Sequence, residues 1–270
     1  MLRTRIFTAA VLACIFLSGL FLLPPPWTVL AFGAAFACGA WEWAGFGALH
    51  GTGARLAYAL GVALLLAFGW FWSAQPTHLM ILLAAAVAWW VIALLWLCLG
   101  PARHGSTLVL LCGAAVLVPP FVALGRLALT TRGLASGPVA VLWLVLLVVA
   151  ADVGAYFAGR SLGKRKLAPR VSPGKTWEGV GGGLALVALV AACGALYFGL
   201  PPLAAIAFAC AVGIFSVIGD LTESMFKRAA GLKDSGVLLP GHGGLLDRLD
   251  SVTAAAPLYA LGLFGSGVIK

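Results

Sequence analysis

The stretch MILLAAAVAWWVIALLWLCL, residues 80–99, runs for twenty positions without a charged side chain, a glycine or a proline. A helix of roughly 20 mostly apolar residues is long enough to cross the hydrocarbon core of a bilayer. We interpret this stretch as a membrane-spanning helix. It sets the fold class of the chain, because similar stretches recur on both sides of it with only brief polar interruptions.

The apolar stretches account for almost the whole chain. Of its 270 residues, 63% are hydrophobic and only 9% are charged, too few to cover a soluble protein with polar surface. The sequence predicts an all-α, polytopic transmembrane protein that forms one membrane domain over residues 1–270. About nine spans are expected, at residues 6–23, 27–49, 56–72, 80–99, 107–127, 139–158, 180–200, 202–226 and 252–268.

Two of these stretches have unusual features. Arg3 and Arg5 precede the first, as in a secretory signal, but no A-x-A-like cleavage site follows it, which favours a first span. Pro119 and Pro120 lie inside the fifth, and we expect them to kink or divide it. Each of the six cysteines lies within an apolar stretch, so neither a disulfide framework nor a CxxC metal site is indicated.

The basic residues predict the orientation in the membrane. With the N-terminus inside, the cytoplasmic segments hold 14 of the 17 lysines and arginines. This arrangement explains much of the net charge of +9, without any need for nucleic acid binding. We therefore expect a multi-pass protein of the inner (cytoplasmic) membrane, with residues 160–178 and 227–250 facing the cytoplasm.

The acidic residues are distributed differently. Seven of the eight fall after residue 151, and the first 151 positions hold only Glu42. Because acidic residues contribute little to orientation, topology does not explain this asymmetry. We infer that residues 150–252, approximately, form the catalytic polar half.

The first polar cluster follows the sixth predicted span. Asp152 ends an apolar run and is expected to face a polar cavity, because an ionisable group at membrane depth is costly. Further on, Ser172, Lys175 and Thr176 lie in a basic, glycine-containing loop. Such a loop suits a polyphosphate, although a solvated basic loop is the alternative. The GxxxxGK[ST] spacing of a Walker A loop is absent.

The second cluster lies on the eighth predicted helix. Ser216, Asp220, Glu223, Ser224 and Lys227 recur at three- and four-residue steps, which places them on one helix face. At the entry to the ninth span, two more carboxylates, at positions 247 and 250, would share a face. Two carboxylate-bearing helix ends can converge on Mg²⁺. The alternative is ion pairing within the membrane, of Asp220 or Glu223 with Lys227 and of Asp247 with Arg248.

A glycine-rich loop joins these two carboxylate groups. It contains Lys233 and the sequence Gly241-His242-Gly243-Gly244. Glycines let the backbone approach a ligand closely and turn N–H groups toward an anion. His242 could donate to a phosphate, or it could be a structural histidine.

The segment SMFKRAAGLKDSGVLLPGHGGLLDRLD, residues 224–250, resembles the full signature of the CDP-diacylglycerol synthases, also called phosphatidate cytidylyltransferases. The segment SPGKTWEG, residues 172–179, is similar to a second family stretch, which more often has lysine where Gly174 stands. Residues 1 to about 140 resemble the family in span pattern alone. The resemblance implies condensation of CTP with phosphatidate to CDP-diacylglycerol and pyrophosphate, with Mg²⁺ as the cofactor.

The resemblance and the residue types together suggest a role for each polar residue. Asp220 and Asp247 are the expected principal metal ligands, with Asp250 in support. Asp220, Asp247, Lys227 and Lys233 are the expected catalytic residues. The expected substrate-binding residues are Ser172, Lys175, Thr176, Ser224, Arg228, His242, Gly243, Gly244 and Arg248. A second cation and a homodimer are left open.

Two other classes of membrane protein share some of these features. A CDP-alcohol phosphotransferase also uses paired aspartates, but its DG-x-x-AR start and four-residue aspartate spacing are absent. An ion-coupled transporter would place Asp152 and Asp220 at cation sites within the bilayer. It would leave the Gly-His-Gly-Gly loop unexplained, and no repeated halves are evident.

Overall fold

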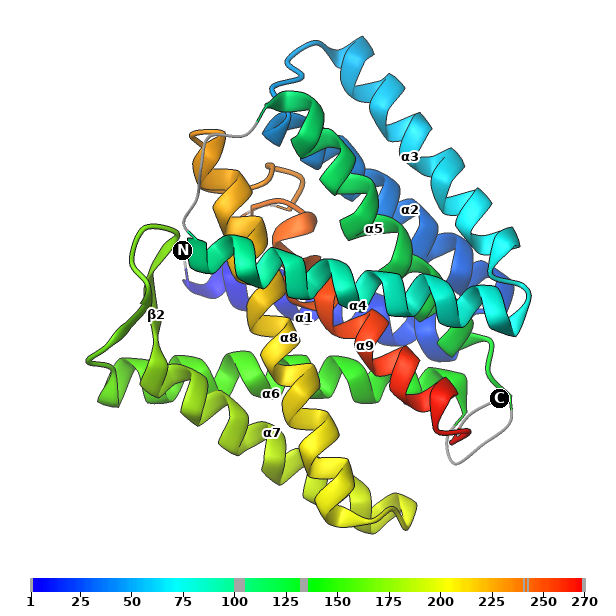
Figure 1. The fold of residues 1–270 in the computed structure, drawn as a ribbon, viewed down its shortest axis with the longest axis vertical. Helices are drawn as coiled ribbons and strands as arrows, with labels where there is room; N and C mark the ends of the chain where they lie inside the picture. The colour runs from blue at the N-terminus through cyan, green and yellow to red at the C-terminus, as the bar shows by residue number, and fades with distance from the viewer. Residues whose placement is uncertain (1, 100–104, 132–135, 240, 242, 269–270) are drawn as a thin grey trace.

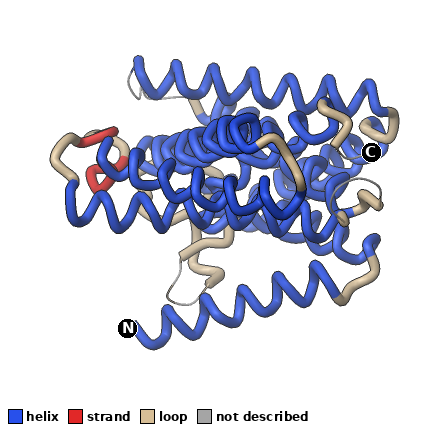
Figure 2. The backbone as a smooth tube through the Cα atoms, turned by 90° about the horizontal axis from the view of Figure 1, so that it is seen from below, coloured by secondary structure: helices blue, strands red, loops and turns tan. Residues whose placement is uncertain are grey.

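The computed structural model describes residues 2–99, 105–131, 136–239, 241 and 243–268, and within them the chain is almost entirely helical (Figures 1 and 2). Among the described residues, six helices precede a small two-stranded sheet and three follow it. In order, the elements are α1 (Leu2–Phe21), α2 (Pro25–Phe46), α3 (Thr52–Trp72), α4 (Pro76–Leu99), α5 (Ser106–Ala128), α6 (Gly137–Leu162), β1 (Lys166–Ala168), β2 (Ser172–Thr176), α7 (Trp177–Phe198), α8 (Pro202–Ala229) and α9 (Leu246–Gly265).

The predicted fold class is confirmed, and the number of spans is approximate. Helices α2 to α8 are each long and apolar enough to cross a membrane. In α1, the apolar part within the described residues is the shorter run Ala10–Phe21. Helix α9 opens with Asp247, Arg248 and Asp250, which lowers the apolar character of its first turns. The chain is therefore a multi-pass helical membrane protein.

Contacts at the two ends of the bundle agree with helices that alternate in direction. At one end, Trp43 near the end of α2 donates from Nε1 to the carbonyl of Val109 near the start of α5, at 2.8 Å. At the other end, Arg126 near the end of α5 donates to Ser73, which follows α3, and lies over the Trp70 ring at 4.1 Å. Helix α1 begins and α9 ends on opposite sides of the bundle (Figure 1).

The fifth span is not divided, contrary to one of the outcomes expected for Pro119 and Pro120. Both prolines are buried inside α5, which is assigned as one helix over its 23 residues. Helices α2, α3, α4, α6 and α9 all pack against α5. A proline removes one backbone hydrogen bond, and close packing by neighbouring helices lets a membrane helix tolerate that loss.

Helices α6 and α7 pack closely side by side (Figure 1). A Cβ atom at Gly154 of α6 would lie 2.5 Å from the carbonyl oxygen of Gly182 in α7. Small residues at such positions allow two membrane helices to approach at backbone distance. This contact brings the C-terminal half of α6, with Asp152, next to the start of α7.

The turn between α6 and α7 is an antiparallel hairpin, which the sequence did not predict. Strands β1 and β2 pair Lys166 with Thr176 and Ala168 with Ser172. The Glu178 carboxylate accepts hydrogen bonds from the backbone N–H groups of Lys164 and Arg165. Figure 2 shows the two strands at one end of the helical bundle. The hairpin holds the predicted polyphosphate loop in a defined shape.

The hydrophobic core extends to the polar region through aromatic side chains. The rings of Trp43 on α2 and Phe226 on α8 have centroids 5.2 Å apart, and Trp96 of α4 packs edge-on against Phe226 at 5.8 Å. Trp43 and Phe226 are almost completely buried. Helix α2, from the N-terminal half, is thus packed directly against the polar end of α8.

Candidate active site

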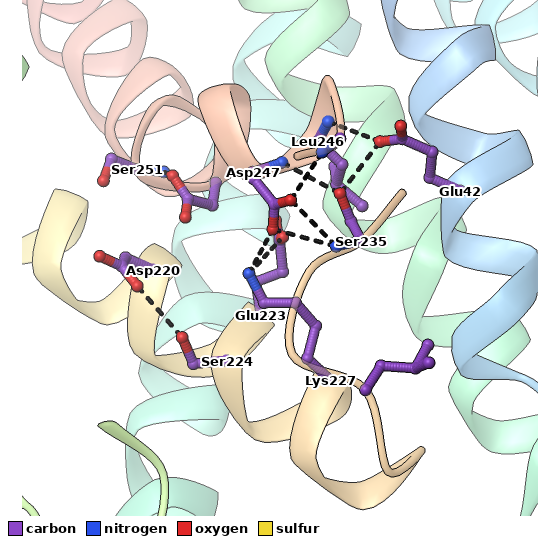
Figure 3. Close-up of polar contacts among 12 residues, drawn as sticks. Glu42, Asp220, Glu223, Ser224, Lys227, Ser235, Leu246, Asp247 and Ser251 are labelled. Atoms are coloured by element: carbon purple, nitrogen blue, oxygen red, sulfur yellow. Dashed lines mark hydrogen bonds and ion pairs between the residues drawn. The ribbon is translucent and has the colours of Figure 1, made fainter. Parts of the chain in front are cut away.

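The start of α9 lies against the C-terminal half of α8, and this contact assembles the predicted carboxylates (Figure 3). A Cβ atom at Gly219 would lie 2.4 Å from the backbone oxygen of Asp250, so only glycine permits this approach. Asp220 follows Gly219 directly in the chain. The charges of Asp220 and Asp250 are consequently close enough to interact.

Asp247 is the most extensively bonded of these carboxylates. Its Oδ1 accepts from Lys227 Nζ at 2.6 Å, and its Oδ2 accepts from the backbone N–H groups of Ser235 at 2.9 Å and Gly244 at 2.8 Å. Partial burial opposes ionisation of Asp247, but these hydrogen bonds and the Lys227 charge outweigh it and lower its pKa. Asp247 is therefore held as a carboxylate at neutral pH.

Lys227 connects α8 to α9 through two carboxylates. Its Nζ lies 3.1 Å from Oε1 of Glu223, one helical turn back, and 2.6 Å from Asp247 Oδ1. All three side chains are largely buried. The alternative of ion pairing within the membrane therefore holds for Glu223 and Lys227. Asp247, for which a pair with Arg248 was the alternative, forms an ion pair with Lys227.

Asp220 links α8 to the hairpin. Its Oδ2 lies 2.6 Å from Lys175 Nζ at the end of β2, and its Oδ1 accepts from Ser224 Oγ at 3.2 Å. Both side chains of the Lys175–Asp220 pair are about one quarter exposed. The structure thus brings together the two polar clusters that lie apart in the sequence.

A cavity of about 530 Å³ opens beside this ion pair. Its polar lining includes Asp152, which was expected to face a polar cavity and lines this partly apolar one, and Arg160, which donates to the Tyr156 hydroxyl at 2.8 Å. Thr176 also lines the cavity, while its Oγ1 caps α7 by accepting from Gly179 N–H at 3.1 Å. Lys175, Asp220 and Tyr156 add further polar groups, and Ala155, Val180 and Val217 supply an apolar part. The cavity can therefore receive a ligand with both charged and apolar groups.

The loop between α8 and α9, residues 230–245, carries the other predicted contacts. Gly243, at φ +79°, pairs with Leu239 in an isolated bridge, and Lys233 is exposed. Arg228, just before the loop, donates to the carbonyls of Val171 and Leu232. Arg248 is exposed on α9, Ser172 is half-buried at the start of β2, and His242 lies outside the described residues.

Two residues of this region were missed by the sequence analysis. Glu42, on α2, accepts hydrogen bonds from the backbone N–H groups of Leu245 and Leu246 and from Ser235 Oγ (Figure 3). A single carboxylate in an apolar helix, 193 to 204 positions before its partners, gave no sequence signal of this contact. Ser235 is buried in the loop and bonds to both Glu42 and Asp247.

The chemistry of the acidic side chains fits a divalent cation. Glu223 is buried, and its Oε2 has no hydrogen-bond partner among the described residues. Acidic groups outnumber basic ones here: Asp152, Asp220, Glu223, Asp247 and Asp250 lie near Lys175, Lys227 and Arg248. Within the described ranges, no three metal-ligating side chains converge on one point. Carboxylate oxygens are the type of ligand that Mg²⁺ takes, and Mg²⁺ often uses only one or two of them plus substrate phosphates.

Comparison with known proteins places the chain among lipid-related transferases. Residues 3–264 match the model of the cytidylyltransferase family. A phosphatidate cytidylyltransferase of Pseudomonas aeruginosa is 43% identical, over 99% of this chain and 98% of the relative. One of Haemophilus influenzae is 42% identical, over 96% of this chain and 98% of the relative. One of Brucella suis is 51% identical over 134 residues, which are 47% of this chain and 46% of the relative.

Proposed function

The chain belongs to the cytidylyltransferase family of nucleotidyltransferases, and on that premise we propose that it condenses CTP with phosphatidate to give CDP-diacylglycerol and pyrophosphate. The relatives that match over nearly their whole length carry the name of this activity. Membership in this family argues against both alternatives, the CDP-alcohol phosphotransferase and the ion-coupled transporter.

One observation supports this proposal more than any other: Lys175 and Asp220 meet at the edge of a cavity between membrane helices. A reaction between a water-soluble nucleotide and a membrane lipid needs charged groups at such a boundary. The cavity offers charged surface for the nucleotide and apolar surface for the lipid, because charged side chains lie beside Ala155, Val180 and Val217.

In the proposed reaction, an oxygen of the phosphatidate phosphate attacks the α-phosphorus of CTP. The new P–O bond forms as the bond between the α-phosphorus and the bridging oxygen to the β-phosphate breaks, and pyrophosphate leaves. A phosphomonoester is largely ionised at pH 7, so no side chain has to act as a nucleophile. The remaining tasks are to position two anions and to neutralise their charge.

The basic residues are suited to these tasks. Lys175 at the cavity and the exposed Lys233 would contact the CTP triphosphate, with Arg228, Arg248 and Ser172 nearby as further contacts. Lys227 would stay between Glu223 and Asp247 and keep those carboxylates in place. Gly243, Gly244 and His242 remain proposed phosphate contacts of the loop.

Mg²⁺ is the proposed cofactor, with Asp220, Asp247 and Asp250 as its candidate ligands. When bound, it would neutralise phosphate charge and polarise phosphoryl oxygens. Both oxygens of Asp247 already accept two hydrogen bonds each, so a cation bound there would displace one of them. The longest, from Ser235 N–H to Oδ1 at 3.2 Å, could be displaced while Ser235 keeps its 2.9 Å bond to Oδ2. Asp220 would exchange Lys175 for the cation when the lysine turns to the triphosphate.

The proposed site faces the cytoplasm of a bacterial inner membrane. The segments 160–178 and 227–250, which include the hairpin and the α8–α9 loop, lie at the same end of the bundle and hold 10 of the 17 lysines and arginines, which favours the cytoplasmic side. The proposal is tested by incubating purified protein with CTP, Mg²⁺ and phosphatidate, and identifying CDP-diacylglycerol among the products by mass spectrometry. Failure to form that lipid would contradict it.

A further inference from the structure

We propose that Glu42, from the N-terminal half of the chain, is a positioning residue that holds the α8–α9 loop and thereby orients Asp247. This inference rests on the proposed function for its catalytic consequence. Glu42 is 2% exposed on α2. Burying a carboxylate in a membrane protein is costly, so its retention requires strong compensating interactions.

The compensation comes from the backbone at the start of α9. Glu42 Oε1 accepts from Leu245 N–H at 3.0 Å, and Oε2 accepts from Leu246 N–H at 2.8 Å. The first N–H groups of a helix have no partner within it, and the positive end of the helix dipole favours a carboxylate there. Leu245 itself offers no side-chain cap. Glu42 therefore supplies, from another helix, the cap that the start of α9 lacks.

Glu42 also bonds to Ser235, which lies in the loop ten residues before Leu245. Ser235 Oγ donates to Glu42 Oε2 at 3.1 Å and accepts from Asp247 N–H at 3.3 Å, while Ser235 N–H donates to Asp247 Oδ2 at 2.9 Å. One side chain thus separates Glu42 from Asp247. The Glu42 carboxylate therefore holds the loop at two points, at Ser235 and at its last residue, Leu245, and this loop bonds to Asp247.

The loop backbone fits closely around the Glu42 carboxylate. A Cβ atom at Gly236 would lie 2.4 Å from Glu42 Oε1, and one at Gly244 would lie 2.6 Å from Oε2. Gly244 N–H is also one of the donors to Asp247. Displacement of the Glu42 carboxylate would consequently move a group that holds Asp247 in place.

All three partners of Glu42 donate, so an amide of the same shape cannot replace the carboxylate. In Glu42→Gln, the NH₂ group must face the N–H of either Leu245 or Leu246, whichever way the amide is turned. At least one hydrogen bond to a charged group is then lost, and local opening of the loop should rise about tenfold or more. The misplaced Asp247 should lower kcat by between about tenfold and a hundredfold.

Hydrogen–deuterium exchange on the full-length protein in detergent tests the structural part of this inference. In Glu42→Gln, amides of residues 235–247 should exchange about tenfold faster than in the wild type. Thr28→Val is the matched control, because it removes a different buried hydrogen bond of α2, from Thr28 Oγ1 to the Gly19 carbonyl at 2.9 Å. It should leave exchange in 235–247 and kcat unchanged. Equal exchange in the wild type and Glu42→Gln would overturn the inference.

Turnover tests the catalytic part. Glu42→Gln should lower kcat by a larger factor than it raises the KM for CTP. The substitution reaches Asp247 through both Ser235 and Gly244, whereas Gly244 is the proposed phosphate contact that packs against Glu42. Faster exchange with an unchanged kcat would overturn the positioning role. If Glu42→Gln does not fold, Ser235→Ala, which keeps both α9 caps, should give a smaller change in the same residues; no change there would also contradict the inference. An inactive wild type would refute the proposed function, and the exchange comparison would still decide whether Glu42 orders the loop.

Discussion

Lys175 Nζ lies 2.6 Å from Asp220 Oδ2, so a single ion pair joins the hairpin to α8 at the edge of the cavity. Both side chains are partly exposed, and ion pairs in such positions add little to stability. The pair can therefore open at small cost. We propose that Lys175 moves to the triphosphate and Asp220 to the cation during the reaction. Substitutions of the two residues should therefore change different kinetic properties, the CTP dependence for Lys175 and the Mg²⁺ dependence for Asp220.

Lys175→Ala should raise the KM for CTP and also slow the reaction. The lysine is proposed to neutralise the triphosphate, and alanine removes that charge. The measurement is the initial rate as a function of CTP at saturating phosphatidate, and then of phosphatidate at saturating CTP. An unchanged CTP dependence together with an altered phosphatidate dependence would move Lys175 to the lipid headgroup.

Asp220→Asn and Asp247→Asn should nearly abolish turnover in protein that still inserts and purifies. Each change removes a charged candidate ligand, so the residual rate should depend more steeply on Mg²⁺ and recover partly with Mn²⁺. Asp234→Asn is the control, because Asp234 is exposed in the loop and outside the carboxylate cluster. Near wild-type rates in both test variants would refute the metal assignment.

Lys227→Met should strongly destabilise the protein. The change leaves Glu223 and Asp247 without their shared cation in a buried site, and breaking a buried pair typically costs about 3–5 kcal/mol. Thermal unfolding in detergent measures the loss. Adding Glu223→Gln to Lys227→Met removes one unpaired charge and should restore part of the stability. A double variant no more stable than Lys227→Met would contradict this account of the pair.

Cysteine labelling should place the hairpin and the α8–α9 loop on the cytoplasmic side. In a variant whose six native cysteines are replaced, Ser172→Cys and Asp234→Cys should react with an impermeant maleimide only when the inner face is accessible. Gln75→Cys, exposed between α3 and α4, should react from outside intact cells. Labelling of residue 172 or 234 from outside would reverse the orientation.

The sequence predicted the features that depend on local patterns. The apolar lengths indicated the spans, and the helical spacing of Asp220, Glu223 and Lys227 indicated a shared face that the structure confirms. The paired carboxylates of α9 were also expected. These predictions succeeded because helix periodicity and hydrophobic length are properties of short segments.

Features that depend on tertiary packing were not predictable in this way. The hairpin needs Glu178 to bond to the backbone of Lys164 and Arg165, whereas the sequence indicated only a basic loop there, either polyphosphate-binding or solvated. The intact α5 depends on the helices packed around Pro119 and Pro120. Glu42 reaches the site only because α2 packs against α8 and α9. No pattern in the sequence indicates which distant helix will lie beside a given one.

Pyrophosphate release by the purified protein tests the central claim most directly. We expect CTP and Mg²⁺ to give pyrophosphate only when phosphatidate is also present, with the lipid product formed in equal amount. Asp220→Asn, purified in parallel, should release almost none. Pyrophosphate release that does not depend on phosphatidate, or its absence from folded wild-type protein supplied with all three, would contradict the proposed function.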